Sequence, residues 1–86
     1  MTYRVEFTAG AARQMKRLPR PAQIRVLDAI AMLGSEPRPR GCRKLAGEDL
    51  AWRIRVGEYR VIYEVLDSML TVTVVRAGHR REVYDR

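Results

Sequence analysis

The sequence predicts an α+β fold in which two helices pack on one face of a mainly antiparallel, twisted sheet. Residues 52–65 alternate apolar and polar side chains around a glycine, as a β-hairpin does. Residues 8–33 carry apolar side chains at helical spacing, and residues 69–75 are rich in β-branched residues. Two helices on one side of a sheet form a two-layer sandwich, here with the order β-α-α-β-β-β.

The N-terminal third supplies the first strand and the helical hairpin. Residues 3–7 alternate apolar and charged side chains, and Thr8 can cap the helix that follows. Pro19 ends this helix, and Pro21 suits the first turn of a second helix that runs to about Leu33. The predicted inner stripes are Ala11, Met15 and Leu18 on the first helix, and Ile24, Leu27, Ile30 and Ala31 on the second, flanked by Val26 and Leu33.

Residues 35–50 form a loop that contains a basic run before the hairpin. Such a loop is either a solvated crossover or part of a binding surface. We favour contact with phosphate through Arg43 and Lys44, because the loop leads directly into the hairpin. Leu45 is expected to plug the edge of the core.

The hairpin turn is predicted at Gly57 and Glu58, because glycine accepts the positive φ that a tight hairpin turn requires. This turn fixes the pairing of the two strands. The expected pairs are Val56 with Tyr59, Arg55 with Arg60, Ile54 with Val61, Arg53 with Ile62, and Trp52 with Tyr63. One face of the hairpin is therefore apolar and faces the helices.

The other face of the hairpin carries Arg53, Arg55 and Arg60 and is expected to be open. Arg55 opposite Arg60 destabilises the sheet locally, because like charges repel across neighbouring strands. Guanidinium groups bind phosphate oxygens in pairs, so this face is interpreted as a phosphate-binding surface. The alternative is a solvated face on which the arginine stems merely cover the sheet.

The last third continues with a turn at Asp67 and Ser68 and a strand over residues 69–75, expected at or near the centre of the sheet. Residues 76–86 are interpreted as a turn and a short basic tail. Val83 would anchor this tail, and Tyr84 would point to the opposite side.

The composition indicates one domain of 86 residues with a formal charge of +7, which is typical of a protein that meets nucleic acid or an acidic protein. A single cysteine, Cys42, excludes an internal disulfide and cannot form a zinc site with one histidine, so we expect no metal or cofactor and a reducing compartment. No signal peptide or membrane span is apparent, which predicts a cytoplasmic protein.

Residues 52–63, the valine-rich strand after them and residues 78–84 together resemble the RelE branch of the RelE/ParE toxin superfamily, and the likeness extends over the chain. The resemblance implies a RelE-like fold and the toxin of a type II toxin–antitoxin pair. Such a toxin is an endoribonuclease that cuts mRNA in the ribosomal A site, where the 2′-hydroxyl attacks the adjacent phosphate. Its expected partners are the ribosome, mRNA and an acidic, RelB-like antitoxin with which it forms a hetero-oligomer.

The resemblance also assigns roles to residues of this chain. Arg53 and Arg55 stand where the family has a basic pair, Arg60 matches a hairpin arginine, and Arg80 and Tyr84 match a terminal arginine and tyrosine. Arg60 and Arg80 would stabilise the phosphate, and Tyr84 would stack on or orient a base or hydroxyl. The predicted substrate-binding residues are Arg43, Lys44 and Arg81.

The identity of the general base departs from the family pattern. The RelE toxin that is best understood has lysines where this chain has Arg53 and Arg55, and arginine is a poor base because it keeps its proton. His79 is a candidate acid or base, or alternatively a loop histidine that only caps the tail. Glu48 and Asp49 are weaker candidates for the base.

Two other functions remain open at this point. A ParE-like toxin would bind and poison DNA gyrase without cutting RNA, but that branch generally lacks the basic and aromatic residues quoted above. A catalytically degenerate toxin would persist as an antitoxin-binding module. The absence of the two lysines supports this alternative.

Overall fold

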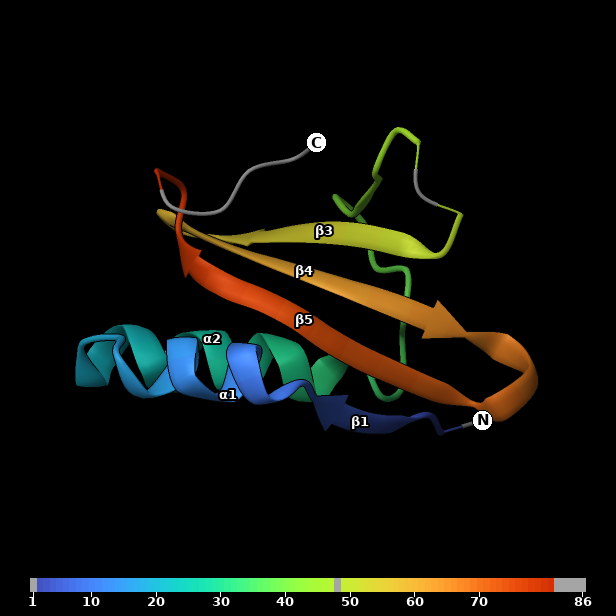
Figure 1. Cartoon of the computed structure of the whole chain (residues 1–86), viewed down its shortest axis with the longest axis horizontal. Helices are drawn as coiled ribbons and strands as arrows, with labels where there is room; N and C mark the ends of the chain where they lie inside the picture. The colour runs from blue at the N-terminus through green and yellow to red at the C-terminus, as the bar shows by residue number, and fades with distance from the viewer. Residues whose placement is uncertain (1, 48, 82–86) are drawn as a thin grey trace.

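A five-stranded sheet in the order β1-β5-β4-β3-β2 carries two helices on one face (Figure 1). The computed structural model describes residues 2–47 and 49–81. Its elements are β1 (Arg4–Phe7), α1 (Ala9–Lys16), α2 (Arg20–Met32), β2 (Arg43–Lys44), β3 (Ala51–Val56), β4 (Tyr59–Leu66), a 3₁₀ turn (Asp67–Met69) and β5 (Thr71–His79). The α+β class and the helical hairpin are confirmed, while β2 is an edge strand that the sequence did not predict.

The boundaries of the helices follow from local chemistry. The backbone N–H of Ala11 donates to Oγ1 of Thr8 at 3.1 Å, which confirms Thr8 as the N-cap of α1. Pro21 lies in the first turn of α2, where its missing N–H leaves no hydrogen bond unmade. Neither helix in the described part of the chain is long and apolar enough to cross a lipid bilayer.

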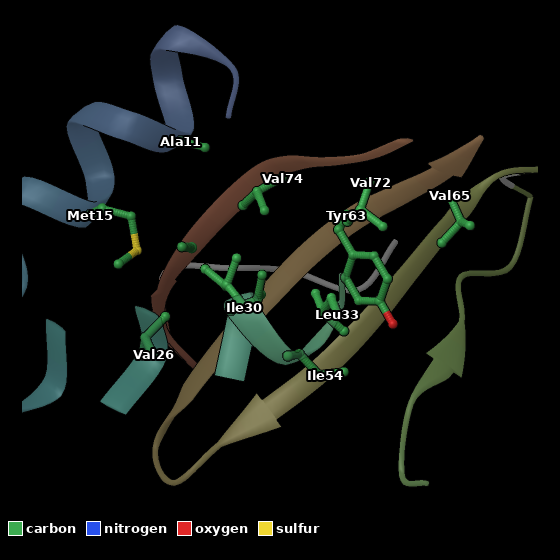
Figure 2. Packing of buried hydrophobic residues seen from close by; sticks show 12 residues of the cluster. Ala11, Met15, Val26, Ile30, Leu33, Ile54, Tyr63, Val65, Val72 and Val74 are labelled. Carbon is green, nitrogen blue, oxygen red and sulfur yellow. The ribbon is translucent and has the colours of Figure 1, made fainter. Parts of the chain in front are cut away.

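The main core lies between the helices and the sheet (Figure 2). Its fully buried members include Val26 and Ile30 from α2, Leu33 after it, and Tyr63 from β4. The predicted inner stripe of α2 is wrong for two large residues, because Ile24 is 49% and Leu27 is 43% exposed. Two sides of α2 carry apolar residues at helical spacing, so periodicity alone did not select the buried side. The residues that α2 buries are Ala22, Val26 and Ile30.

The hairpin has the predicted register throughout. Val56 pairs with Tyr59, Arg55 with Arg60, and Trp52 with Tyr63. Gly57 has a φ of 61°, as the turn requires. The apolar face therefore meets the helices, and the arginine side chains belong to the other face.

The last strand is longer than predicted. β5 extends to His79 instead of turning at Arg76, and it lies between β4 and β1, near the centre of the sheet as predicted. Its pairing with β1 is parallel, which makes the sheet mixed. A bulge changes the β4 register, so that Ile62 pairs with Arg76 but Tyr63 pairs with Val74. The extra residue keeps Arg76 out of the core and turns Ala77 into it.

The sheet face opposite the helices is partly covered, which corrects the expectation of a fully open basic face. Leu45 packs there with Ala51 and Ile62, and Val75 borders this smaller cluster. The backbone N–H of Leu45 donates to the carbonyl of Ala51 at 3.0 Å and holds the loop beside β3. Leu45 is buried as predicted, but in this second cluster rather than in the main core.

A network of polar contacts stabilises the end of the sheet that lies opposite the hairpin turn. Both terminal nitrogens of Arg38 donate to the carboxylate of Asp67, at 3.2 and 2.7 Å, and the Tyr3 hydroxyl donates to the same carboxylate. The guanidinium of Arg38 also lies 5.4 Å from the ring centre of Trp52. Arg38 belongs to the basic run of the loop, but it contributes to the fold, because its guanidinium contacts other residues of the same chain.

Candidate nucleic-acid interface

Three arginines meet at the hairpin turn. Arg55 and Arg60 are directly opposite each other on β3 and β4, and Arg80 follows the end of β5. With Gly57 and Tyr59, these arginines line one small hollow of about 40 Å³. Three guanidinium groups around one hollow can stabilise the charge of a phosphate, because each presents paired donors.

Arg80 is held to the hairpin turn by two contacts with Glu58. Its backbone N–H donates to the Glu58 carbonyl at 2.8 Å, and its Nε forms an ion pair with Oε1 of Glu58 at 3.0 Å. The two side chains are 57% and 62% exposed, so the ion pair stays accessible to a ligand. No local pattern in the sequence points to this contact, since Glu58 was interpreted only as a turn residue.

A shallow groove of about 370 Å³ continues from the hairpin towards the edge strand β2. It is lined by Arg43, Lys44, Leu45, Ala46, Arg53 and Arg55. Arg43 is directly opposite Arg53, so a second pair of like charges lies across neighbouring strands. Arg53 itself is only 7% exposed, which departs from the predicted open position because β2 and the residues after it cover β3.

His79 lies apart from the arginines. It is the cross-strand partner of Tyr59, and the two rings meet edge to face at 5.7 Å on the helix side of the sheet. A separate hollow of about 430 Å³ is lined there by Gln14, Arg17, Leu18, Pro19, Tyr59, Ala77, Gly78 and His79. The backbone N–H of Arg81 donates to Nδ1 of His79 at 3.2 Å.

The remaining predicted site residues are dispersed or not described. Arg81 is exposed, and Asp49 precedes β3 at the end of the hairpin far from Gly57. Tyr84, Val83 and Glu48 lie outside the described residues. Sequence reasoning also missed Arg25 of α2, whose Nη2 would lie 2.5 Å from a Cβ on Gly57 and so packs against the hairpin turn.

Marked pKa shifts occur at the opposite end of the sheet. The guanidinium of Arg38 and the hydroxyl of Tyr3 hydrogen-bond to Asp67 and lower the pKa of its carboxyl group. The same carboxylate raises the pKa of Tyr3, and burial raises the pKa of Tyr63, whose hydroxyl donates to the Pro37 carbonyl at 2.7 Å. These shifts accompany contacts that hold the fold together. Among residues 2–47 and 49–81, no group of three His, Cys, Asp or Glu side chains is placed to hold a metal ion.

Comparison with known proteins finds a family model and a relative that are both toxins. The family model described as ParE toxin of type II toxin–antitoxin system, parDE, matches residues 5–84. Toxin RelG of Mycobacterium tuberculosis is 36% identical over 90 residues, covering 100% of both chains.

Solved structures agree with this relationship. A chain of the RelBE2 toxin–antitoxin complex of Mycobacterium tuberculosis superposes with a TM-score of 0.81 and 33% identity, over 93% of this chain and 100% of that one. A chain of the archaeal RelE–RelB complex of Pyrococcus horikoshii gives a TM-score of 0.82 and 33% identity, over 96% and 100% of the two chains.

Proposed function

Because this chain belongs to the RelE branch of the RelE/ParE superfamily of type II toxins, we propose that it is an endoribonuclease that cuts mRNA in the ribosomal A site. The meeting of Arg55, Arg60 and Arg80 at one hollow carries the proposal. RNA cleavage by an internal hydroxyl requires positive groups around the phosphorane, and these arginines provide them. The cell compartment in which it would act is the cytoplasm, where ribosomes translate.

The reaction places a 2′-hydroxyl in line with the neighbouring phosphorus. As the O2′–P bond forms, the P–O5′ bond breaks, which leaves a 2′,3′-cyclic phosphate and a free 5′-hydroxyl. Arg60 is half-buried and positioned by the sheet, whereas Arg80 is exposed and held by Glu58. Together they would bind the non-bridging phosphate oxygens, whose negative charge grows as the reaction proceeds. The groove along Arg43 and Lys44 would guide the strand on either side of the cut.

The partner proposed to restrain this activity is an acidic, RelB-like antitoxin that forms a hetero-oligomer with the toxin. The related chains in the Mycobacterium tuberculosis and Pyrococcus horikoshii structures are parts of such complexes. A net charge of +7 favours an acidic partner, since opposite charge speeds association and selects against other basic chains.

Primer extension tests the proposed activity. Purified protein is added to ribosomes programmed with a defined message and, separately, to the naked message. We expect cuts in the A-site codon that depend on the ribosome. Arg60→Ala with Arg80→Ala should lower the cleavage rate by at least about 100-fold, because this double variant no longer stabilises the charge of the transition state at two points. Arg13→Ala with Lys16→Ala removes the same charge from the exposed face of α1 and should cleave normally.

A gyrase target is the second candidate, favoured by the match to the ParE toxin family model. Supercoiling by purified gyrase distinguishes the two functions. Inhibition of supercoiling, together with intact messages on ribosomes, would replace the ribonuclease proposal with gyrase poisoning.

A further inference from the structure

The guanidinium groups of Arg55, Arg60 and Arg80, which form the arginine cluster in the described part of the chain, cannot accept a proton from the attacking hydroxyl. Arg55 and Arg53 keep their protons at physiological pH, so they stabilise charge without acting as bases. His79 faces the helices, on the other side of the sheet from these arginines. A proton acceptor must lie within hydrogen-bond reach of the hydroxyl it activates, so a base for this cluster must lie at the hairpin turn.

Most carboxylates of the described residues are engaged or distant from this turn. Asp67 is bound by Arg38 at the far end of the sheet, and Glu6 pairs with Arg4 at 3.4 Å on β1. Glu64 shares a strand face with Arg60 but lies four residues away, roughly 13 Å along an extended strand. Asp49 precedes β3 at the end opposite the turn.

Glu58 is placed differently from these carboxylates. Its Oε1 forms an ion pair with Nε of Arg80 at 3.0 Å, and its carbonyl accepts from the Arg80 backbone N–H at 2.8 Å. Arg80 lines the same hollow as Arg55 and Arg60. A phosphate that Arg80 binds at this hollow would therefore lie near the Glu58 carboxylate, which is paired with Arg80 although Glu58 itself does not line the hollow. The second oxygen of the carboxylate is available on an exposed surface, since the side chain is 62% exposed.

We propose that Glu58 is the proton acceptor of the RNA cleavage, an inference that rests on the proposed ribonuclease function. The carboxylate takes the proton of the 2′-hydroxyl while the O2′–P bond forms. The P–O5′ bond breaks, and the 5′-oxygen leaves with the electron pair and takes a proton from water. Arg80 orients the carboxylate through Nε, and the terminal nitrogens of its guanidinium donate to the phosphate.

The Glu58→Gln variant tests this role. Glutamine keeps a carbonyl oxygen that can accept from Nε of Arg80, but it cannot take up a proton. We expect the cleavage rate on programmed ribosomes at saturating toxin to fall about 100- to 10,000-fold, the usual contribution of general base catalysis. Binding to ribosomes whose message carries a 2′-O-methyl group at the cut nucleotide should stay unchanged. Glu64→Gln is the matched control and should cleave at the wild-type rate.

Each alternative outcome has a distinct meaning. A wild-type rate from Glu58→Gln overturns the inference, and so does an equal loss of rate and ribosome binding, which would mark Glu58 as a positioning residue for Arg80. If the wild-type protein does not cut at all, the proposed ribonuclease function fails instead. Circular dichroism melting of each variant verifies the fold, and Glu58→Asp, which retains a carboxylate, should recover part of the rate.

Discussion

At the scale of single residues, Gly57 determines where the hairpin turns and therefore which residues pair across it. Its positive φ closes the hairpin, and the hairpin register places Arg55 opposite Arg60. The sequence predicted this pair because glycine marks the turn and because alternation fixes the faces. Local patterns could not place Arg80 beside them, since that contact depends on the distant end of β5 and on Glu58, and only the family resemblance put Arg80 with Arg60. They also overestimated the exposure of Arg53, which β2 and Leu45 help to cover.

Gly57→Ala should destabilise the protein by about 1–2 kcal/mol, because an L side chain is strained at a φ of 61°. Urea unfolding measures the loss. Gly47→Ala is the matched control, since Gly47 has a φ of 78° and open space around its Cβ position. The two variants should lose similar stability, because Arg25 can move its flexible end away from Gly57. A much larger loss at Gly57 that Arg25→Ala restores would show instead that Arg25 is fixed.

Asp67 should make stability depend on acidity. Its pKa is lowered in the folded protein, chiefly by the hydrogen bonds from Arg38, so its contribution is present above its unfolded pKa of about 3.9. The contribution disappears as the pH falls through the lower folded pKa. Asp67→Asn should therefore flatten the curve of urea midpoint against pH on its acid side. Arg38→Ala removes the same contact and should flatten the curve likewise, and an unchanged curve in both variants would contradict the assignment.

At the scale of elements, the structure separates what local rules determine from what tertiary packing determines. Thr8, Pro21 and Gly57 specify where elements start or turn, and all three predictions are confirmed. The buried side of α2 was not predictable from spacing, because apolar residues lie on two sides of the helix. The bulge in β5 was equally hidden, since Val74 and Val75 are both apolar and only pairing with β4 shows which one is extra.

Two isoleucines of α2 provide a matched test of the buried side. Ile30→Ala should cost about 2–5 kcal/mol, because Ile30 is 2% exposed and its truncation leaves a cavity in the core. Ile24→Ala should change stability by less than about 1 kcal/mol, because half of that side chain is already in water. Urea unfolding of both variants provides the comparison. Equal losses would mean that α2 packs with a different side towards the sheet.

At the scale of the whole molecule, the basic residues behind the net charge of +7 lie on more than one surface. The groove of Arg43, Lys44 and Arg55 borders the arginine cluster, while Arg13 and Lys16 face outward from α1. Composition predicted an anionic partner but could not say which surface meets it. The pairing of strands favours the groove as the proposed surface, because β2 brings its two cations beside the hairpin.

Salt dependence should reveal the difference between the two surfaces. On single-stranded RNA, removing one cation that binds a phosphate reduces the slope of log affinity against log salt by about 0.7. Arg43→Ala with Lys44→Ala should therefore flatten the slope in fluorescence anisotropy titrations. Arg13→Ala with Lys16→Ala carries the same net charge and should keep a slope near that of the wild type. If both pairs flatten the slope equally, binding follows total charge and the groove has no special part in it.

The parallel pairing of β1 with β5 affects when the protein can fold during its synthesis. Residues 4–7 are synthesised well before residues 71–74, the segment of the same chain that completes their hydrogen bonds. Arg80 follows later still, so the cluster cannot assemble on a growing polypeptide. Topology thereby delays the assembly of the arginine cluster until residue 80 has been synthesised.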